Sequence, residues 1–139
     1  MTKTALVTGA GRGIGKTIAI ELAKAGYDVC VSYCGSEAQA MDTKAQIEAL
    51  GRKCIALKAD LSQVESIAPL FNAFEKEFGA MDLLVNNAGI TKDGLLMGMS
   101  EEDFDQVLDV NLKGTFNMMR FVSRQMLRQR SGRIISMAS

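Results

Sequence analysis

Short apolar runs alternate with longer amphipathic segments along the chain. The runs at residues 5–7, 28–33, 54–57, 81–85 and 133–137 are each predicted to form a strand. After the first run, Ile14, Ile18, Leu22 and Ala25 recur at three- and four-residue spacing, which is typical of one face of a helix. Further helices are predicted at residues 36–50, 62–78 and 100–129.

Local signals set two of the helix starts. Ser62 and Glu65 have the spacing of a capping box and are predicted to open the third helix. Pro69 lies inside that helix and should kink it or delay its regular part. Ser100 and Asp103 are predicted to start the long last helix.

Alternation of strands and helices predicts an α/β fold with a doubly wound, Rossmann-like parallel sheet. With the first strand central, the expected strand order is 3-2-1-4-5. Ligands of such sheets lie beyond the carboxyl ends of the strands, where the strand order reverses. Thr8, Gly9, Asp60 and residues 86–89 are expected at that edge.

Four glycines follow the first strand and open the first helix. Gly9, Gly13 and Gly15 form G-x-x-x-G-x-G, which differs from the G-x-G-x-x-G of long-chain dinucleotide enzymes. An ATPase-type phosphate loop would need a glycine five places before Gly15, where the sequence has Ala10. Backbone N–H groups at a helix start suit a pyrophosphate. A tight turn without a ligand is the alternative.

Composition excludes several function classes. Sixteen basic and sixteen acidic side chains cancel, so no net charge recruits nucleic acid or a membrane surface. The three cysteines have no metal-ligand spacing, and no histidine accompanies them, so we expect free thiols and no metal. No apolar run approaches a membrane span, and the first strand starts too early for a signal peptide. The 139 residues are expected to form one cytoplasmic domain.

Five motifs in order resemble those of the short-chain dehydrogenase/reductase family. They are TGAGRGIG at 8–15, Asp60–Leu61, NNAG at 86–89, Asn111 within DVNLKGTF, and RIISMAS at 133–139. The stretch NNAGITKDGLLMGMSEEDF at 86–104 is most similar to the 3-oxoacyl-(acyl-carrier-protein) reductases of fatty-acid synthesis. The resemblance spans the whole chain.

The resemblance implies a set of cofactor-binding residues. In it, Asp60 accepts the adenine amino group and the Leu61 N–H completes recognition of the ring, although Asp60 could instead cap the following helix. Asn86 and Asn87 also brace the central strand. The expected cofactor-binding residues are Gly9, Ala10, Gly11, Arg12, Gly13, Ile14, Gly15, Cys34, Asp60, Leu61, Asn87, Ala88 and Gly89.

The second strand indicates which dinucleotide is bound. Enzymes that prefer NAD place an acidic residue near the end of this strand, for the ribose 2′-OH. Here the strand ends in neutral Ser32, Tyr33 and Cys34, and Arg12 in the glycine turn offers a guanidinium for a 2′-phosphate. We therefore predict NADPH. Glu37, just past the strand, is the residue that could reverse this preference, and an exposed loop charge is the alternative role of Arg12.

The resemblance also implies the catalytic residues. Ser139 matches the serine that hydrogen-bonds the substrate carbonyl, and Asn111 matches an asparagine that holds a proton-relaying water. The family's Tyr-x-x-x-Lys pair is absent, because neither Tyr27 nor Tyr33 has a lysine four places later. We expect residues 1–139 to be the N-terminal part of a longer single-domain reductase.

The long helix carries an arginine stripe, Arg120, Arg124 and Arg128, with Arg130 and Arg133 nearby. It is either a solvated face or a docking patch for the acidic acyl carrier protein. Phe104, Leu108, Phe116 and Met119 on the other face should be core or subunit interface, since the family commonly forms a homotetramer through this helix.

Three functions are weighed. The first is NADPH-dependent reduction of 3-oxoacyl thioesters bound to acyl carrier protein. The second is a related reductase acting on acetoacetyl-CoA, a sugar or a steroid. The third is a non-catalytic dinucleotide-binding module, which would bind cofactor without turnover.

Overall fold

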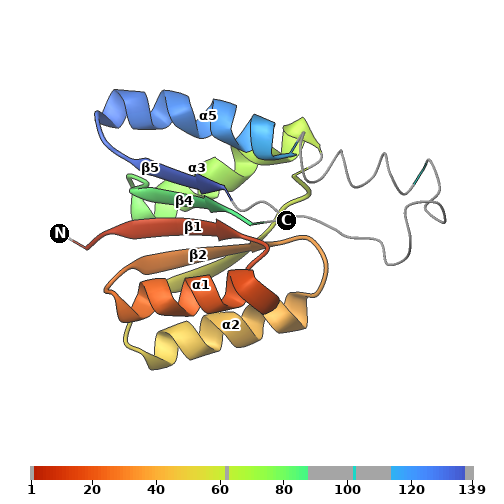
Figure 1. Cartoon of the computed structure of the whole chain (residues 1–139), viewed down its shortest axis with the longest axis vertical. Helices are drawn as coiled ribbons and strands as arrows, with labels where there is room; N and C mark the ends of the chain where they lie inside the picture. The colour runs from red at the N-terminus through yellow and green to blue at the C-terminus, as the bar shows by residue number, and fades with distance from the viewer. Residues whose placement is uncertain (1, 62, 88–101, 103–113, 137–139) are drawn as a thin grey trace.

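The computed structural model describes residues 2–61, 63–87, 102 and 114–136. Helices cover both faces of a central sheet, so the fold has three layers (Figure 1). The elements in chain order are β1 (Thr4–Thr8), α1 (Gly13–Lys24), β2 (Asp28–Tyr33), α2 (Glu37–Ala49), β3 (Cys54–Lys58), the short 3-10 helix η1 (Val64–Ser66), α3 (Ile67–Phe78), β4 (Leu83–Asn86), α5 (Gly114–Gln129) and β5 (Arg133–Ser136).

Five strands of the described residues form one sheet in the order β3-β2-β1-β4-β5, which confirms the predicted topology. Every neighbouring pair is parallel, and β1 is central, pairing Val7 with Val31 of β2 and with Val85 of β4. The strand ends of β1 and β4 therefore lie side by side, and the chain leaves them toward opposite halves of the sheet.

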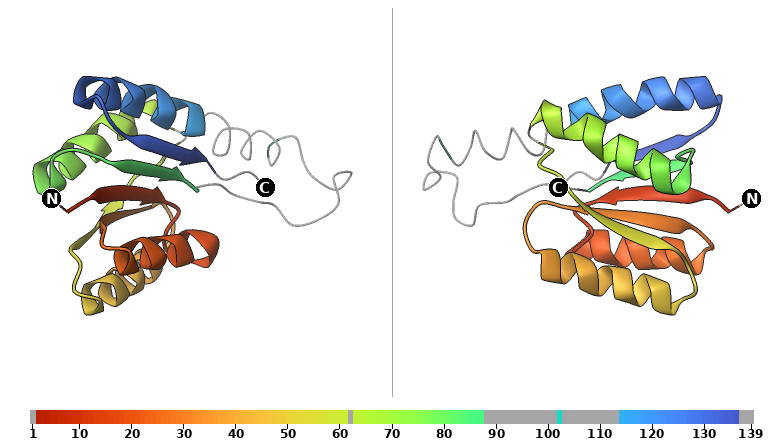
Figure 2. Two further views of the ribbon diagram at one scale, coloured as in Figure 1. Left: turned by 60° about the vertical axis from the view of Figure 1, so that its left-hand side comes forward. Right: turned by 180° about the vertical axis from the view of Figure 1, so that it is seen from behind.

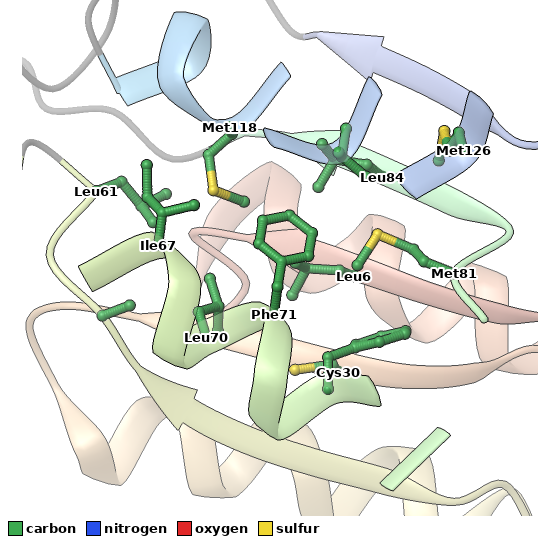
Figure 3. Packing of buried hydrophobic residues seen from close by; sticks show 13 residues of the cluster. Leu6, Cys30, Leu61, Ile67, Leu70, Phe71, Met81, Leu84, Met118 and Met126 are labelled. Atoms are coloured by element: carbon green, nitrogen blue, oxygen red, sulfur yellow. The ribbon is translucent and has the colours of Figure 1, made fainter. Parts of the chain in front are cut away.

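Alternate residues of the strands point to opposite faces of the sheet and pack in two separate hydrophobic cores. Leu6, Cys30 and Leu84 pack against α3 and α5, with Phe71 and Met118 among their partners (Figure 3). The intervening strand residues face the other way and pack against α1 and α2; they are Ala5, Val7, Val29, Val31, Leu83 and Val85. Figure 2 shows the two helix pairs on opposite faces of the sheet.

The apolar repeat of α1 marks its buried face only in part, because Ile18 and Leu22 are half-buried against the core while the ends of the repeat are exposed. Gly15, Ala19 and Ala23 are buried, whereas Ile14 is 64% exposed and Ala25 is also exposed. The buried stripe is displaced by one residue because only small side chains let the helix lie close against the sheet. Periodicity predicted the helix correctly, but size decided which face is inside.

The start of α3 differs from the predicted capping box. A 3-10 turn precedes the helix, and the N-cap is Ser66, whose side chain makes no capping bond. Ser62 lies outside the described residues. Pro69 delays the regular helix as expected, since it falls in the first turn, where its missing N–H is tolerated.

Helix α5 buries Met118, Val122 and Met126, while Phe116 is 61% and Met119 38% exposed. Of the two places expected for Phe116 and Met119, core or subunit interface, the core is therefore excluded and the interface stays a prediction. Phe104 and Leu108 lie outside the described residues. The arginines Arg120, Arg124, Arg128, Arg130 and Arg133 are all exposed. The start predicted at Ser100 and Asp103 also lies outside the described residues.

Over the residues that the structure describes, no helix combines the length and the apolar character needed to cross a membrane.

Candidate functional site

A cleft of about 650 Å³ opens at the carboxyl ends of the strands. Its wall comes from four segments that are far apart in the sequence: the glycine turn after β1, the end of β2 with the connection to α2, the residues after β3, and Asn87 after β4. The parallel topology brings all four to one edge of the sheet. This is the position that the sequence predicted for a ligand.

The glycine turn crosses over the end of β2. The backbone N–H of Gly9 donates to the carbonyl oxygen of Ser32 at 3.0 Å, and that of Ala10 donates to the same oxygen at 3.4 Å. Gly9 and Gly13 have φ angles of +65° and +60°, which side-chain-bearing residues rarely adopt. Ala10 is fully buried, so the turn is anchored from below while Gly9, Gly11 and Gly13 line the cleft.

Helix α1 starts directly at the cleft. Its N-cap is Arg12, and within the described residues no side chain caps this helix start. The N–H groups of the first turn therefore remain available to a ligand, together with the positive end of the helix dipole. Gly15 lets the helix come this close, because a Cβ there would collide with the Gly9 carbonyl oxygen and with the side-chain amide of Asn87.

Asn87 braces the turn from the neighbouring strand. Its backbone N–H donates to Thr8 Oγ1 at 2.9 Å, and its side-chain Nδ2 donates to the Gly9 carbonyl oxygen at 3.2 Å. Thr8 Oγ1 in turn donates to the Val85 carbonyl oxygen at 3.4 Å. The first glycine is thus held by the end of β4 as well as by the end of β2.

The opposite wall of the cleft is mostly neutral. Ser32, Tyr33 and Cys34 line it, and Cys34 is exposed. Among the described residues, Glu37 is exposed and is not part of the cleft wall. Arg12 is the basic residue of the wall and Asp60 its acidic residue.

The segment after β3 closes the cleft beyond that wall. The Ala59 N–H donates to the Tyr33 carbonyl oxygen at 2.9 Å, which holds this segment against the end of β2. Asp60 is exposed at the cleft, whereas Leu61 is 7% exposed and also packs in the core with α3. An acidic and an apolar residue are thereby placed side by side.

Most of the predicted cofactor-binding residues that the structure describes meet at this cleft. They are Gly9, Gly11, Arg12, Gly13, Cys34, Asp60, Leu61 and Asn87. Ala10 and Gly15 are buried beneath the turn, and Ile14 projects from the first turn of α1 without lining the cleft. Ala88, Gly89, Asn111 and Ser139 lie outside the described residues.

Sequence reasoning gave no site role to several residues of the wall. Ser36 and Gln39 belong to the start of α2, where Ser36 Oγ accepts the Gln39 N–H at 3.2 Å. Gly35 and Ala59 complete the connections after β2 and β3. The sequence signal that could have identified them is their place between a strand and the helix after it. In a parallel sheet each such connection lies at the carboxyl ends of the strands, where ligands bind.

The donor set fits a dinucleotide. Accessible glycine backbone and an uncapped helix start suit a pyrophosphate, and the guanidinium of Arg12 suits a further phosphate. Leu61 and Ala59 offer apolar surface beside the Asp60 carboxylate, a combination that suits a heteroaromatic ring carrying an amino group.

Comparison with known proteins agrees with this geometry. The sequence profile described as short chain dehydrogenase matches residues 3–139. The 3-oxoacyl-[acyl-carrier-protein] reductase FabG of Staphylococcus aureus (strain Mu50) is 48% identical over the whole chain, and the reductase of that name from Synechocystis sp. is 44% identical over 99% of it. The chain spans 56% of the length of each of these relatives.

A crystal structure of an NAD⁺-bound xylitol dehydrogenase superposes with a TM-score of 0.93 at 31% identity. The superposition covers 99% of this chain and 53% of that protein.

Proposed function

Because the chain belongs to the short-chain dehydrogenase family, we propose that its cleft binds NADPH for the reduction of 3-oxoacyl thioesters. The observation that carries the proposal is the cleft at the β1–β4 edge, where an uncapped helix start and accessible glycines meet. The bound nicotinamide would supply the hydride that reduces the substrate carbonyl. The residues of this chain would bind and orient the cofactor.

The glycine turn and the first turn of α1 would hold the pyrophosphate, and Asp60 with the Leu61 N–H would hold the adenine. Ala88 and Gly89, which follow Asn87, would pass close to the ribose. Ala10 and Gly15 would act through the turn that they support, and Ile14 would act through its backbone N–H in the first turn of α1. These roles are proposals for the residues that line or adjoin the cleft.

NADPH is the preferred cofactor in this proposal. The supporting observations are Arg12 in the cleft wall, the neutral end of β2, and the absence of Glu37 from the described wall. A guanidinium offers paired N–H donors to a phosphate, whereas no carboxylate at the end of β2 is in place to hold a free 2′-OH.

The 3-oxoacyl substrate is proposed from the names of the staphylococcal and cyanobacterial relatives. In this proposal residues 1–139 form the N-terminal part of a single-domain reductase. Ser139 would hydrogen-bond the substrate carbonyl, and Asn111 would hold a water that relays protons. The proton-donating tyrosine and its lysine partner are not among the 139 residues.

The experiment is an assay of the polypeptide that carries this chain. NADPH oxidation is followed on addition of an acetoacetyl thioester of acyl carrier protein, and NAD⁺ reduction is followed on addition of xylitol. The proposal expects turnover with the thioester. Turnover with xylitol alone would replace it with the second candidate, a polyol or sugar dehydrogenase, which the likeness to xylitol dehydrogenase supports. Cofactor binding with no turnover on either would indicate a non-catalytic module.

The exposed arginines of α5 are the proposed docking surface for acyl carrier protein. Arg124→Glu should raise KM for the carrier-bound substrate about five- to tenfold and spare a small uncharged acetoacetyl thioester, because a surface charge acts on encounter with the charged partner. Lys24→Glu on α1 is the matched charge reversal on the other face of the sheet. Equal effects of Arg124→Glu on both substrates would contradict the docking surface.

We propose a cytoplasmic homotetramer that pairs α5 between subunits. Support comes from Phe116 and Met119, which are large apolar residues exposed on this helix. Light scattering of the polypeptide that carries this chain should give a tetramer, and Phe116→Glu should give smaller species.

A further inference from the structure

A buried hydroxyl joins the glycine turn to α2, in addition to the two backbone hydrogen bonds that join this turn to Ser32 at the end of β2. Thr43 lies on α2, is fully buried, and donates through Oγ1 to the Ala10 carbonyl oxygen at 3.0 Å. The same oxygen atom is 3.5 Å from the Gly11 carbonyl oxygen and 3.2 Å from that of Gln39. The contact spans more than thirty residues of sequence, from the glycine turn to the helix that follows β2.

Helix α2 and the glycine turn also lie next to each other at this point, with ordinary van der Waals spacing. A Cβ on Gly11 would lie 3.5 Å from the backbone nitrogen of Ala40 and equally close to the side chain of Gln39. Ala40 is fully buried and Gln39 lines the cleft. The first turns of α2 therefore form the support on which the glycine turn rests, and any change in their separation changes the width of the cleft.

A second interaction holds α2 in place, an ion pair to α1, and it is weaker. Lys16 Nζ pairs with Asp42 Oδ2 at 2.8 Å, but the two side chains are 29% and 58% exposed. An exposed ion pair contributes little and is screened by salt. The hydrogen bond from the Thr43 hydroxyl is buried, so water and salt weaken it less than they weaken this ion pair.

We infer that Thr43 is a positioning residue for dinucleotide binding, an inference that rests on the proposed function. Thr43 does not itself line the cleft. Its hydroxyl contacts the backbone of the glycine turn at Ala10 and Gly11, and it acts on a bound ligand through that turn. Without its hydroxyl the turn and α2 populate other separations. The apparent affinity then falls with the fraction of molecules in the binding-competent arrangement.

The competing explanation is local. A threonine in a helix often bonds the carbonyl four residues back, here that of Gln39, and such a bond would concern only α2. The hydroxyl has a single proton, and the Ala10 carbonyl is the nearer acceptor. That carbonyl belongs to a fully buried residue, and a buried acceptor left without a donor is destabilised.

The test is calorimetric titration of NADPH and of adenosine 2′,5′-bisphosphate into Thr43→Val, which keeps the shape of the side chain and removes the hydroxyl. Kd should rise about three- to tenfold for both ligands, the range that one hydrogen bond corresponds to. Thr43→Ser keeps the hydroxyl and should restore wild-type Kd. Thr43→Cys, a weaker donor of similar size, should give a smaller rise and serves as the test if the valine variant does not fold.

The matched control is Thr4→Val. Thr4 is also buried and its hydroxyl also donates to a backbone carbonyl, that of Ala80, but it lies at the opposite end of β1 from the cleft. This variant should lower the thermal unfolding midpoint and leave Kd unchanged. If the wild-type protein binds and Thr43→Val has the same Kd, the inference is overturned. It is also overturned if Kd rises equally in Thr43→Val and Thr4→Val. Failure of the wild-type chain to bind either ligand would instead count against the proposed function.

Discussion

The side-chain amide of Asn87 donates to the carbonyl oxygen of Gly9 at 3.2 Å, although 78 residues separate them. This bond ties the end of β4 to the first glycine after β1, at the point where the two halves of the sheet diverge. Gly15 fits beneath both groups, since a Cβ there would meet the same oxygen and the same amide. The three residues form one packed unit under the cleft.

Gly15→Ala should disrupt that unit. A methyl group placed against backbone cannot be accommodated by a rotamer change, so we expect a loss of about 1–3 kcal/mol in the free energy of unfolding. NADPH affinity should fall more than tenfold, because the helix start is pushed out of the turn. Chemical denaturation and calorimetry measure the two effects. Gly35→Ala is the control for stability alone, since a Cβ there meets nothing within 4 Å, and unchanged stability of Gly15→Ala would contradict the packing.

Arg12→Gln should remove the preference for the phosphorylated cofactor. The charge-assisted bonds to a 2′-phosphate are lost while the glycine backbone is kept, so NADPH affinity should fall about tenfold and NADH affinity should change little. Arg12→Lys should give an intermediate result, because a lysine keeps the charge without the paired donors. A parallel fall for both cofactors would show that Arg12 does not read the 2′-phosphate.

Cys34 should be the thiol that reagents reach first. It is exposed in the cleft wall, whereas Cys30 and Cys54 are buried. Native protein treated with iodoacetamide should gain one carbamidomethyl group, found on Cys34 by peptide mass spectrometry. NADPH should slow this labelling by covering the wall. Labelling at an unchanged rate with saturating NADPH would place the cofactor away from Cys34.

Alkaline pH should destabilise the protein through its buried thiols. Burial raises the pKa of Cys54 to about 12, and burial followed by the proximity of Cys54 raises the pKa of Cys30 well above its ordinary value. In the unfolded chain both thiols ionise nearer pH 9, so between these values the unfolded state binds fewer protons and stability falls as pH rises.

The expected slope is at most about 1.4 kcal/mol per pH unit for each thiol. Denaturant unfolding between pH 8 and 11 measures it. Cys54→Ala should reduce the slope, while Cys34→Ser, which alters an exposed side chain, should not. The same slope in wild type and Cys54→Ala would exclude this origin.

The sheet and most element boundaries could be predicted because they rest on local patterns. The range predicted for β2 matches Asp28–Tyr33, and the helix predicted at residues 36–50 agrees with α2 (Glu37–Ala49) to within one residue at each end. Hydrophobicity predicted the side of α1 where Ile18 and Leu22 contact the core, but not the fully buried positions, where close packing on the sheet selects Ala19 and Ala23. Tertiary contact of this kind leaves no periodic signal.

The site divides in the same way. The glycines, Arg12 and Asp60 could be named from motifs, which concentrate on the residues that meet a ligand. Thr43 could not, because nothing in a mid-helix threonine indicates that its hydroxyl reaches a carbonyl 33 residues earlier. Ser36 and Gln39 could have been predicted from the topology, since they begin the helix that follows β2, at the carboxyl ends of the strands where ligands bind.

Titration of the polypeptide that carries this chain with NADPH and, separately, with NADH tests the central claim most directly. The account predicts binding at one site per chain, with NADPH bound at least about tenfold more tightly, as expected when charge-assisted bonds hold the extra phosphate. No heat of binding and no ligand-induced rise in the unfolding midpoint with either dinucleotide would contradict the assignment of this cleft.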